Sequence, residues 1–236
     1  MKTQIVASFM PTTIHLSTDD LTLIEEKQQY FDILELRIDA IPDVSLNKVR
    51  QMLEQLHQKG LHKAVLVTFR TTAQGGKGAI LEGVYEGLMK DIAELEQVDY
   101  VDIEWAPSYH RESLVAQIQS TGTDVVVSYH NFHETPQLEV LKKTYYHMSK
   151  WKGTHLKIAV MPHTRQDVLT LLHAVTDASS ALPHWITGIS MSQLGIISRT
   201  AQQTFGGALT YGAITESVAP GQLDVKTLKS AMALYQ

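Results

Sequence analysis

The sequence predicts an α/β fold, a single (β/α)8 barrel with a parallel sheet of eight strands. Eight short apolar runs alternate with amphipathic helical patterns along the 236 residues. No linker rich in Pro, Gly or Ser separates these units, and no strand is followed by the GxGxxG turn that often marks a dinucleotide-binding sheet. We therefore expect one barrel domain over residues 1–236, with an open doubly wound sheet as the alternative.

The strands are predicted from short apolar runs of four to eight residues. They lie at residues 4–10, 32–38, 63–69, 99–104, 124–129, 154–161, 185–191 and 207–212.

The helices are predicted from apolar residues that recur at i, i+3, i+4 and i+7. Three such stripes are Val49, Met52, Leu53 and Leu56; Val168, Leu171, Leu172 and Val175; and Val225, Leu228, Met232 and Tyr235. Thr164 followed by Asp167 predicts a capping box at a helix start. Thr135 before Pro136 predicts a second helix start, with proline at the first helical position.

The composition is that of an ordinary globular protein. Hydrophobic residues make up 44% of the chain and the formal net charge is -5, with no run of Lys or Arg that would indicate a nucleic-acid or membrane surface. The lack of cysteine excludes disulfides, thiolate metal sites and a cysteine nucleophile. No segment approaches a membrane-spanning length, and the N-terminal apolar run is too short for a signal peptide. We expect a cytoplasmic protein that binds neither nucleic acid nor membrane.

Lys157 is the first candidate site residue, because it lies in the middle of the apolar strand at 154–161. In a strand of period two it lies on the face opposite to Leu156, Ile158 and Val160. Burial disfavours the charged form of an amine and lowers its pKa toward the range in which the free amine is a nucleophile. This strand alone is compatible with a Schiff-base lysine or with a strand-end lysine whose ammonium group reaches water.

Other strands also have one apolar and one polar face, and in a parallel barrel one strand face points to the barrel axis. The positions that share the polar face are Glu35, Arg37 and Asp39; Leu66, Thr68 and Arg70; Asp102 and Glu104; and Val126, Ser128 and His130. A single pair such as Glu35 with Arg37 is typical of a structural ion network. Several polar faces that converge on a buried lysine favour a catalytic site, because neighbouring cations ease the loss of its proton.

His130 ends the fifth strand and Lys157 lies on the sixth, so we expect a general base beside an amine nucleophile. Asp102 on the fourth strand is a candidate to hold the imidazole in one tautomer. The HxxH spacing of His130 and His133, with two carboxylates nearby, is also compatible with a metal site, but a metal would compete with the lysine for the same centre. We expect no metal, and interpret His133 as a loop or supporting residue.

Six separated motifs resemble those of the type I 3-dehydroquinate dehydratases of the shikimate pathway. They are ELRID at 35–39, TFR at 68–70, SYHNFHETP at 128–136, KIAVMP at 157–162, ISR at 197–199 and APGQ at 219–222. The resemblance covers nearly the whole chain. It implies a (β/α)8 barrel, commonly a homodimer, that acts as a hydro-lyase on 3-dehydroquinate in aromatic amino acid biosynthesis. It also implies that no metal or organic cofactor is needed.

The resemblance further implies a role for each matching residue. Lys157 attacks the C3 ketone to form an iminium, His130 removes the C2 proton and later returns it to the departing C1 hydroxyl, and Asp102 orients His130. Arg199 matches the residue that grips the substrate carboxylate. Positions that bind hydroxyls or line the pocket are matched by Glu35, Arg37, Arg70, Gln222, Ser8 and Tyr211. The loop at 214–222 resembles a lid over the substrate.

Two positions depart from the family pattern. Gln74 stands where relatives carry a glutamate before the glycine pair, so a role that needs a carboxylate is not carried over. Val218 stands where relatives often carry a serine, and Ser217 lies one place earlier, so a serine contact is not carried over either.

Two alternative functions remain open at this point. A sugar-phosphate aldolase would share the barrel and Lys157, but it would need a phosphate site of backbone amides after strands seven and eight. The sequence has Arg199 and the APGQ loop there. A catalytically silent barrel that only binds a metabolite would have no use for both Lys157 and His130.

Overall fold

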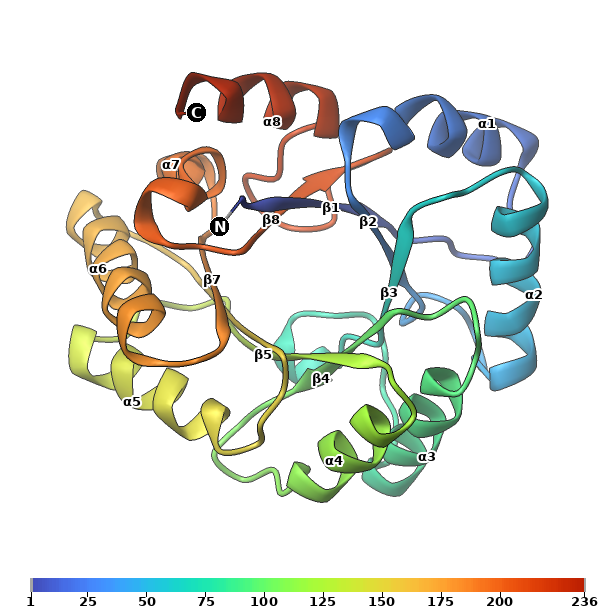
Figure 1. Cartoon of the computed structure of the whole chain (residues 1–236), viewed down its shortest axis with the longest axis horizontal. Coiled ribbons are helices and arrows are strands. Elements are labelled where there is room, and N and C mark those ends of the chain that lie inside the picture. The colour runs from blue at the N-terminus through green and yellow to red at the C-terminus, as the bar shows by residue number, and fades with distance from the viewer. Residues whose placement is uncertain (1, 236) are drawn as a thin grey trace.

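The structure, a computed structural model, describes residues 2–235 as a ring of parallel strands surrounded by helices (Figure 1). The strands are β1 (Gln4–Phe9), β2 (Ile33–Arg37), β3 (Ala64–Thr68), β4 (Tyr100–Glu104), β5 (Asp124–Asn131), β6 (His155–Val160), β7 (Trp185–Ser190) and β8 (Leu209–Ala213). The helices are α1 (Thr18–Lys27), α2 (Leu46–Gln58), α3 (Glu82–Ala93), α4 (Glu112–Ser120), α5 (Leu138–Ser149), α6 (Arg165–Ala181), α7 (Ile196–Thr200) and α8 (Val225–Met232). The predicted (β/α)8 barrel is confirmed, and the two ends of the predicted extent, residues 1 and 236, lie outside the described residues.

The sheet has the order β7-β6-β5-β4-β3-β2-β1-β8, with parallel neighbours throughout. Its two end strands meet at a seam, where Ala208 N donates to Ile186 O at 2.7 Å. Beside this bond, Leu209 N donates to the side-chain oxygen of Thr187 at 3.1 Å. A threonine hydroxyl therefore replaces one rung of the backbone ladder, and the barrel is nearly closed. This order differs from that of an open doubly wound sheet, in which the strand order reverses partway across.

The two faces of each strand contribute to two separate apolar layers, because successive side chains point to opposite sides. Leu156, Ile158 and Val160 belong to the layer between the sheet and the helices, so Lys157 points into the barrel as predicted. Inside the barrel, a second apolar cluster includes Val6, Ile33, Leu66, Val126 and Leu209. These side chains fill the interior toward the N-terminal ends of the strands. The polar inward residues lie above them, toward the C-terminal ends.

Helix packing follows the predicted stripes. The residues predicted for α2 and α6 are all buried: Val49, Met52, Leu53 and Leu56, and Val168, Leu171, Leu172 and Val175. The predicted capping box is confirmed at the start of α6. Thr164 Oγ1 accepts from Asp167 N at 3.2 Å, and Asp167 Oδ2 accepts from Thr164 N at 2.8 Å.

Two local predictions were wrong. Thr135 does not cap a helix, because α5 begins at Leu138 with Gln137 as its N-cap. The Thr135 hydroxyl instead donates to Met161 O at 2.9 Å and ties the loop to the end of β6. Tyr235 does not belong to the buried stripe of α8, because the chain tightens into a 3-10 turn after the helix and leaves this side chain 45% exposed.

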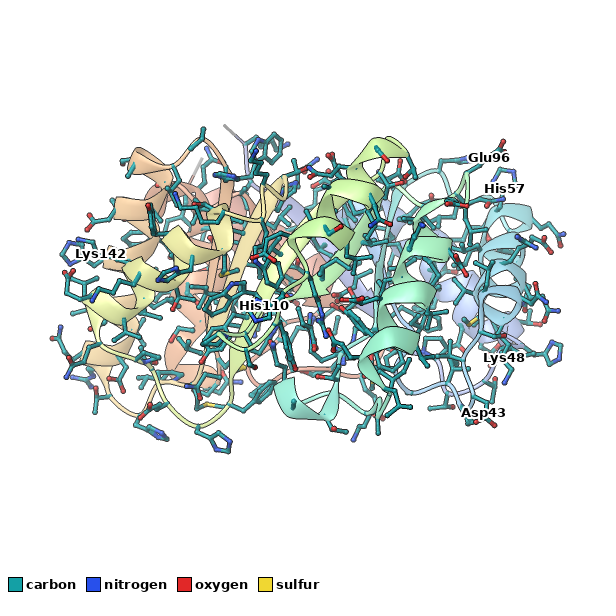
Figure 2. The ribbon with its side chains drawn as sticks, turned by 90° about the horizontal axis from the view of Figure 1, so that it is seen from below. Asp43, Lys48, His57, Glu96, His110 and Lys142 are labelled. Atoms are coloured by element: carbon teal, nitrogen blue, oxygen red, sulfur yellow. The ribbon has the colours of Figure 1, made fainter. Side chains whose placement is uncertain are left out.

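The exposed side of the helices carries polar residues together with a few apolar ones, among them Val84, Val140 and Leu169. Figure 2 shows His57 and Glu96 at the outer edge of the molecule, and both are exposed. No helix between residues 2 and 235 combines the length and the apolar character needed to cross a membrane.

The packing between sheet and helices gives a stability prediction. Leu36 on β2 is fully buried in this layer, so Leu36→Ala should lower the free energy of unfolding by about 2–5 kcal/mol through lost burial and a residual cavity. Leu234, which is 84% exposed, is the control, and Leu234→Ala should stay within about 0.5 kcal/mol of the parent. Urea denaturation followed by circular dichroism measures both. Equal stabilities for the two variants would contradict the assignment of Leu36 to the core.

Candidate active site

A cavity lies at the C-terminal ends of the strands, the end at which (β/α)8 barrels carry their active sites. Nine of the ten predicted site residues line it: Ser8, Glu35, Arg37, Arg70, His130, Lys157, Arg199, Tyr211 and Gln222. The tenth, Asp102, is fully buried and contacts Arg70, which lines the cavity. Seven of the eight strand-helix units therefore place a predicted side chain on the cavity wall. The fourth unit acts indirectly, because its Asp102 contacts Arg70.

Lys157 lies in the middle of β6 and is only 6% exposed. Its Nζ lies 3.7 Å from the centre of the Tyr211 ring, a cation–π distance. Burial lowers the pKa of Lys157 to about 8, and Arg70 and Arg37 add to this effect while Glu35 and Asp102 oppose it. Roughly a tenth of this amine is therefore uncharged at pH 7, and the uncharged form is the one that can act as a nucleophile.

Glu35 connects three elements through hydrogen bonds. Its Oε2 accepts from Ser8 Oγ at 2.5 Å, and its Oε1 accepts from Thr68 Oγ1 at 2.9 Å. Ser8 Oγ in turn accepts from Gln222 Nε2 at 3.1 Å. This network fixes a buried carboxylate near Lys157 and ties the segment before α8 to the barrel wall.

Arg70 is held by three side chains on the two strands that follow it. It pairs with Asp102 Oδ2 at 2.8 Å and Glu104 Oε1 at 3.0 Å, and it donates to Ser128 Oγ at 2.9 Å. Burial lowers the pKa of Arg70, but the two carboxylates outweigh it and the pKa lies above its ordinary value. The guanidinium is therefore a fixed cation with little freedom to turn.

Arg37, like Arg70, is held in place by a buried carboxylate. It pairs with Asp39 through two hydrogen bonds of 2.8 and 2.9 Å. Asp39 also accepts from Lys77 N at 2.9 Å. Burial raises the pKa of Asp39, but Arg37 and the backbone donors outweigh it, so the pKa lies below its ordinary value.

The contacts of His130 differ from the prediction. Asp102 does not contact the imidazole, because its oxygens accept from Ser128 Oγ at 2.7 Å and pair with Arg70. Strand register gives the reason: Asp102 pairs with Val126, and His130 lies four residues further along β5, a span of about 13 Å. Asp102 therefore acts on the site through Arg70 and Ser128.

Gln74 is the polar side chain beside His130. Its Oε1 accepts from His130 N at 2.8 Å and lies 3.4 Å from the ring Nδ1, and its Nε2 donates to Trp105 O at 2.9 Å. Sequence reasoning missed this contact, although the departure from glutamate had already singled out the position. Gln74 can orient the imidazole by hydrogen bonding without adding a charge.

The imidazole of His130 packs beside an aromatic ring and is uncharged. His130 is followed two residues later by Phe132, whose ring is stacked at 6.4 Å between centroids. Burial lowers the pKa of His130 well below its usual 6.5, and Arg70, Lys157 and Arg37 lower it further. The imidazole is therefore neutral at pH 7 and able to accept a proton.

Register places His130 one inward position above the lysine. Ser128 is the partner of Lys157 on β5, and His130 follows it with the same inward direction. The predicted placement of His130 and Lys157 on adjacent strands is therefore confirmed. His133, predicted as a loop residue, is exposed beyond the end of β5.

Arg199 on α7 is 1% exposed and is held by backbone carbonyls, with hydrogen bonds to Tyr211 O at 3.3 Å and Pro220 O at 3.0 Å. Its Nε is buried and has no hydrogen-bond partner among residues 2–235. Burial lowers the pKa of Arg199 to about 10. Because its partners are neutral, its charge is available to an anion in the cavity.

The segment at 214–222, predicted as a lid, forms part of the cavity wall. Val218 lines the cavity, whereas Ser217 is exposed and donates to Ala219 O at 2.7 Å. Gly221 has a φ of +74° and a Cβ there would lie 2.2 Å from a backbone oxygen of the loop after β7, so glycine is required. The segment therefore packs tightly against the neighbouring loop.

Several apolar lining residues were also missed. Ile189 and Met191 line the cavity and share the inward direction of Thr187 along β7, so strand period could have identified them. Phe132 also lines it, but it follows the end of β5, where no periodic signal applies.

Comparison with known proteins identifies the family. The model of the type I 3-dehydroquinase family matches residues 8–236. A 3-dehydroquinate dehydratase of Staphylococcus haemolyticus is 42% identical over 236 residues, covering 98% of this chain and 97% of that protein.

Solved structures agree with this match. The crystal structure of 3-dehydroquinate dehydratase from Geobacillus kaustophilus has a TM-score of 0.92 at 26% identity, covering 99% of this chain and 91% of that one. The type I enzyme of Clostridium difficile, solved with covalent modified comenic acid, has a TM-score of 0.89 at 30% identity, covering 98% and 91%. The chain described here belongs to the type I 3-dehydroquinase family.

Proposed function

We propose that this chain dehydrates 3-dehydroquinate to 3-dehydroshikimate, a step of aromatic amino acid biosynthesis, through an imine on Lys157. Family membership supports the reaction and argues against both a sugar-phosphate aldolase and a catalytically silent barrel. The observation that carries the mechanism is the buried amine of Lys157, whose pKa burial lowers to about 8, on a cavity wall shared with His130.

The mechanism begins with attack of the neutral Lys157 amine on the C3 ketone, and loss of water gives an iminium. The iminium withdraws electrons and acidifies the C2 proton, which neutral His130 removes to leave an enamine. The enamine expels the C1 hydroxyl, and His130 returns its proton so that water departs. A second water molecule hydrolyses the product imine, which releases 3-dehydroshikimate and restores the free amine.

The remaining cavity residues orient the substrate in this proposal. Arg199 binds the substrate carboxylate in bidentate fashion, since its present partners are neutral carbonyls. The hydroxyl groups are bound by Glu35, Arg37, Arg70, Gln222 and Ser8, and Tyr211 forms the wall beneath the lysine.

We further propose that residues 1–236 form one catalytic domain that works as a cytoplasmic homodimer. The iminium supplies the electron sink that a metal or organic cofactor would otherwise provide, so the proposed chemistry needs neither. A small-molecule substrate is the proposed partner, with no role for nucleic acid or membrane.

Covalent trapping tests the proposed imine. Borohydride added with 3-dehydroquinate should reduce the imine and attach the ligand to Lys157, as read by mass spectrometry of the intact protein and of its peptides. Lys157→Ala should show no label and no measurable turnover. Normal turnover by this variant would exclude the imine mechanism.

His130→Ala provides the comparison, because it removes the base but leaves the amine. It should still be labelled by borohydride, while kcat falls by about 10²- to 10⁴-fold, the contribution of a positioned general base. Full activity in this variant would remove His130 from the proposed role.

The depressed pKa of Lys157 predicts how imine formation depends on pH. The amine must be uncharged to attack, so with a pKa of about 8 its reactive fraction rises from roughly a tenth at pH 7 to roughly nine tenths at pH 9. His130 stays neutral over this range because its pKa lies well below 6.5. The single-turnover rate of borohydride trapping should therefore rise by about tenfold between pH 7 and 9. A rate that is flat over this interval would contradict the burial effect.

Arg199 should act mainly on substrate binding. Arg199→Ala removes a charge-assisted contact worth about 1.5–3 kcal/mol, so KM should rise by about 10- to 150-fold with a smaller change in kcat. Arg199→Lys keeps the charge but cannot form the bidentate contact. Its KM should therefore lie between those of the parent and Arg199→Ala. An unchanged KM for Arg199→Ala in steady-state assays would argue against the contact.

A further inference from the structure

We propose that Glu104 is a positioning residue, which anchors Arg70 and the turn that carries Gln74 at one point and thereby holds His130 in its working orientation. This inference rests on the function proposed above. It assigns a task to a buried carboxylate that does not line the cavity and that the mechanism does not otherwise use.

The carboxylate of Glu104 accepts hydrogen bonds from two consecutive residues, Arg70 and Thr71. Glu104 is the last residue of β4 and is fully buried. Oε1 accepts from Arg70 Nη1 at 3.0 Å and from Thr71 N at 2.8 Å, and Oε2 accepts from Thr71 Oγ1 at 2.7 Å. One carboxylate therefore fixes the guanidinium of a site arginine and the backbone of the next residue.

Thr71 connects Glu104 to the turn that follows through hydrogen bonds of its backbone oxygen. Its carbonyl oxygen accepts from Gln74 N at 3.0 Å and from Gly76 N at 2.8 Å. All the polar groups of Thr71 are thus engaged, with its N and Oγ1 on Glu104 and its oxygen on the turn. The position of Thr71 therefore sets the position of Gln74.

The turn has little room to move without disturbing His130. A Cβ on Gly75 would lie 2.3 Å from the Phe132 ring, and a Cβ on Gly76 would lie 2.0 Å from Arg70 O, so the backbone lies directly against both. Gln74 accepts a hydrogen bond from His130 N, and the Phe132 ring stacks on the imidazole of His130. A displacement of the turn would therefore reach His130 from two sides. Misplacement of a catalytic group by about 1 Å is enough to cost about 10²-fold in rate.

Three substitutions separate anchoring from charge. Glu104→Ala removes all three contacts. Glu104→Gln keeps one oxygen for Arg70 and Thr71 N, and its amide can donate to the Thr71 hydroxyl, so the geometry is retained while the charge is lost. Thr71→Val removes only the hydroxyl contact and leaves Arg70 untouched.

Thr154→Val is the matched control. Thr154 Oγ1 donates to Asp124 Oδ1 at 2.6 Å, so this variant also removes a threonine–carboxylate hydrogen bond, but at the opposite end of the barrel, before β6. It should be destabilised to a similar extent as Thr71→Val in thermal melting and should keep the parent kcat.

We expect kcat to fall by about 10- to 100-fold in Glu104→Ala and by about three- to tenfold in Thr71→Val. In both, Lys157 should be labelled by borohydride to the same extent as in the parent, and substrate deuterated at C2 should show an increased kinetic isotope effect because proton removal is the impaired step. Thr71→Val should leave KM unchanged. Glu104→Gln should recover kcat to within about fivefold of the parent, since the anchoring geometry is preserved.

Two outcomes would overturn the proposal. The first is a parent-like kcat in Thr71→Val, which also decides the matter if Glu104→Ala does not fold. The second is a loss in Glu104→Gln as large as that in Glu104→Ala, which would assign Glu104 a charge effect on Arg70 instead. Failure of the proposed function is distinguishable, because the parent protein itself would then show no label on Lys157.

Discussion

The burial of one amine inside the barrel is the constraint on which the rest of the site depends. An uncompensated ammonium is costly in a low-dielectric interior, so Lys157 must lose its proton easily or be balanced by anions. The buried charged side chains of the site and its supports are three arginines and four carboxylates: Arg37, Arg70 and Arg199, with Glu35, Asp39, Asp102 and Glu104. Their formal charges leave one negative charge in excess, which balances Lys157 as an ammonium and equally as the iminium of the proposed mechanism. Glu35 and Asp102 favour a cation at Lys157, while burial, Arg70 and Arg37 oppose it.

The arrangement in layers explains how such a charged group of residues is compatible with a stable fold. The lower interior is filled by apolar side chains such as Val6 and Leu66, and the outer faces of the strands pack on the helices. Polar groups are concentrated near the C-terminal ends of the strands, where Arg70 and Arg37 each have fixed carboxylate partners. The guanidinium groups of Arg37 and Arg70 are therefore paired with carboxylates, whereas Arg199 is held by backbone carbonyls. Fixing these cations in the free protein reduces the ordering cost of binding a ligand.

The loop after β3 connects two buried carboxylates to His130. It is fixed at one end by Glu104 and at the other by Asp39, each of which also pairs with a site arginine. Between these two points it presents Gln74 to His130. The loop is therefore coupled to the two arginines proposed to bind hydroxyl groups, and through Gln74 to the proposed base. This coupling places the base and the binding groups in one connected set of hydrogen bonds.

The sequence by itself determined the barrel, the inward direction of Lys157 and the identity of most cavity residues, because strand period and helix period depend only on local backbone geometry. The six family motifs supplied the reaction and the proposed roles. Only the tertiary structure decided which inward residues touch. Period two places Asp102 and His130 on the same face, but the register between β4 and β5 separates them and leaves Gln74, a loop residue without periodic signal, beside the imidazole. Register and loop paths depend on contacts between distant segments, and these are formed only when the barrel closes.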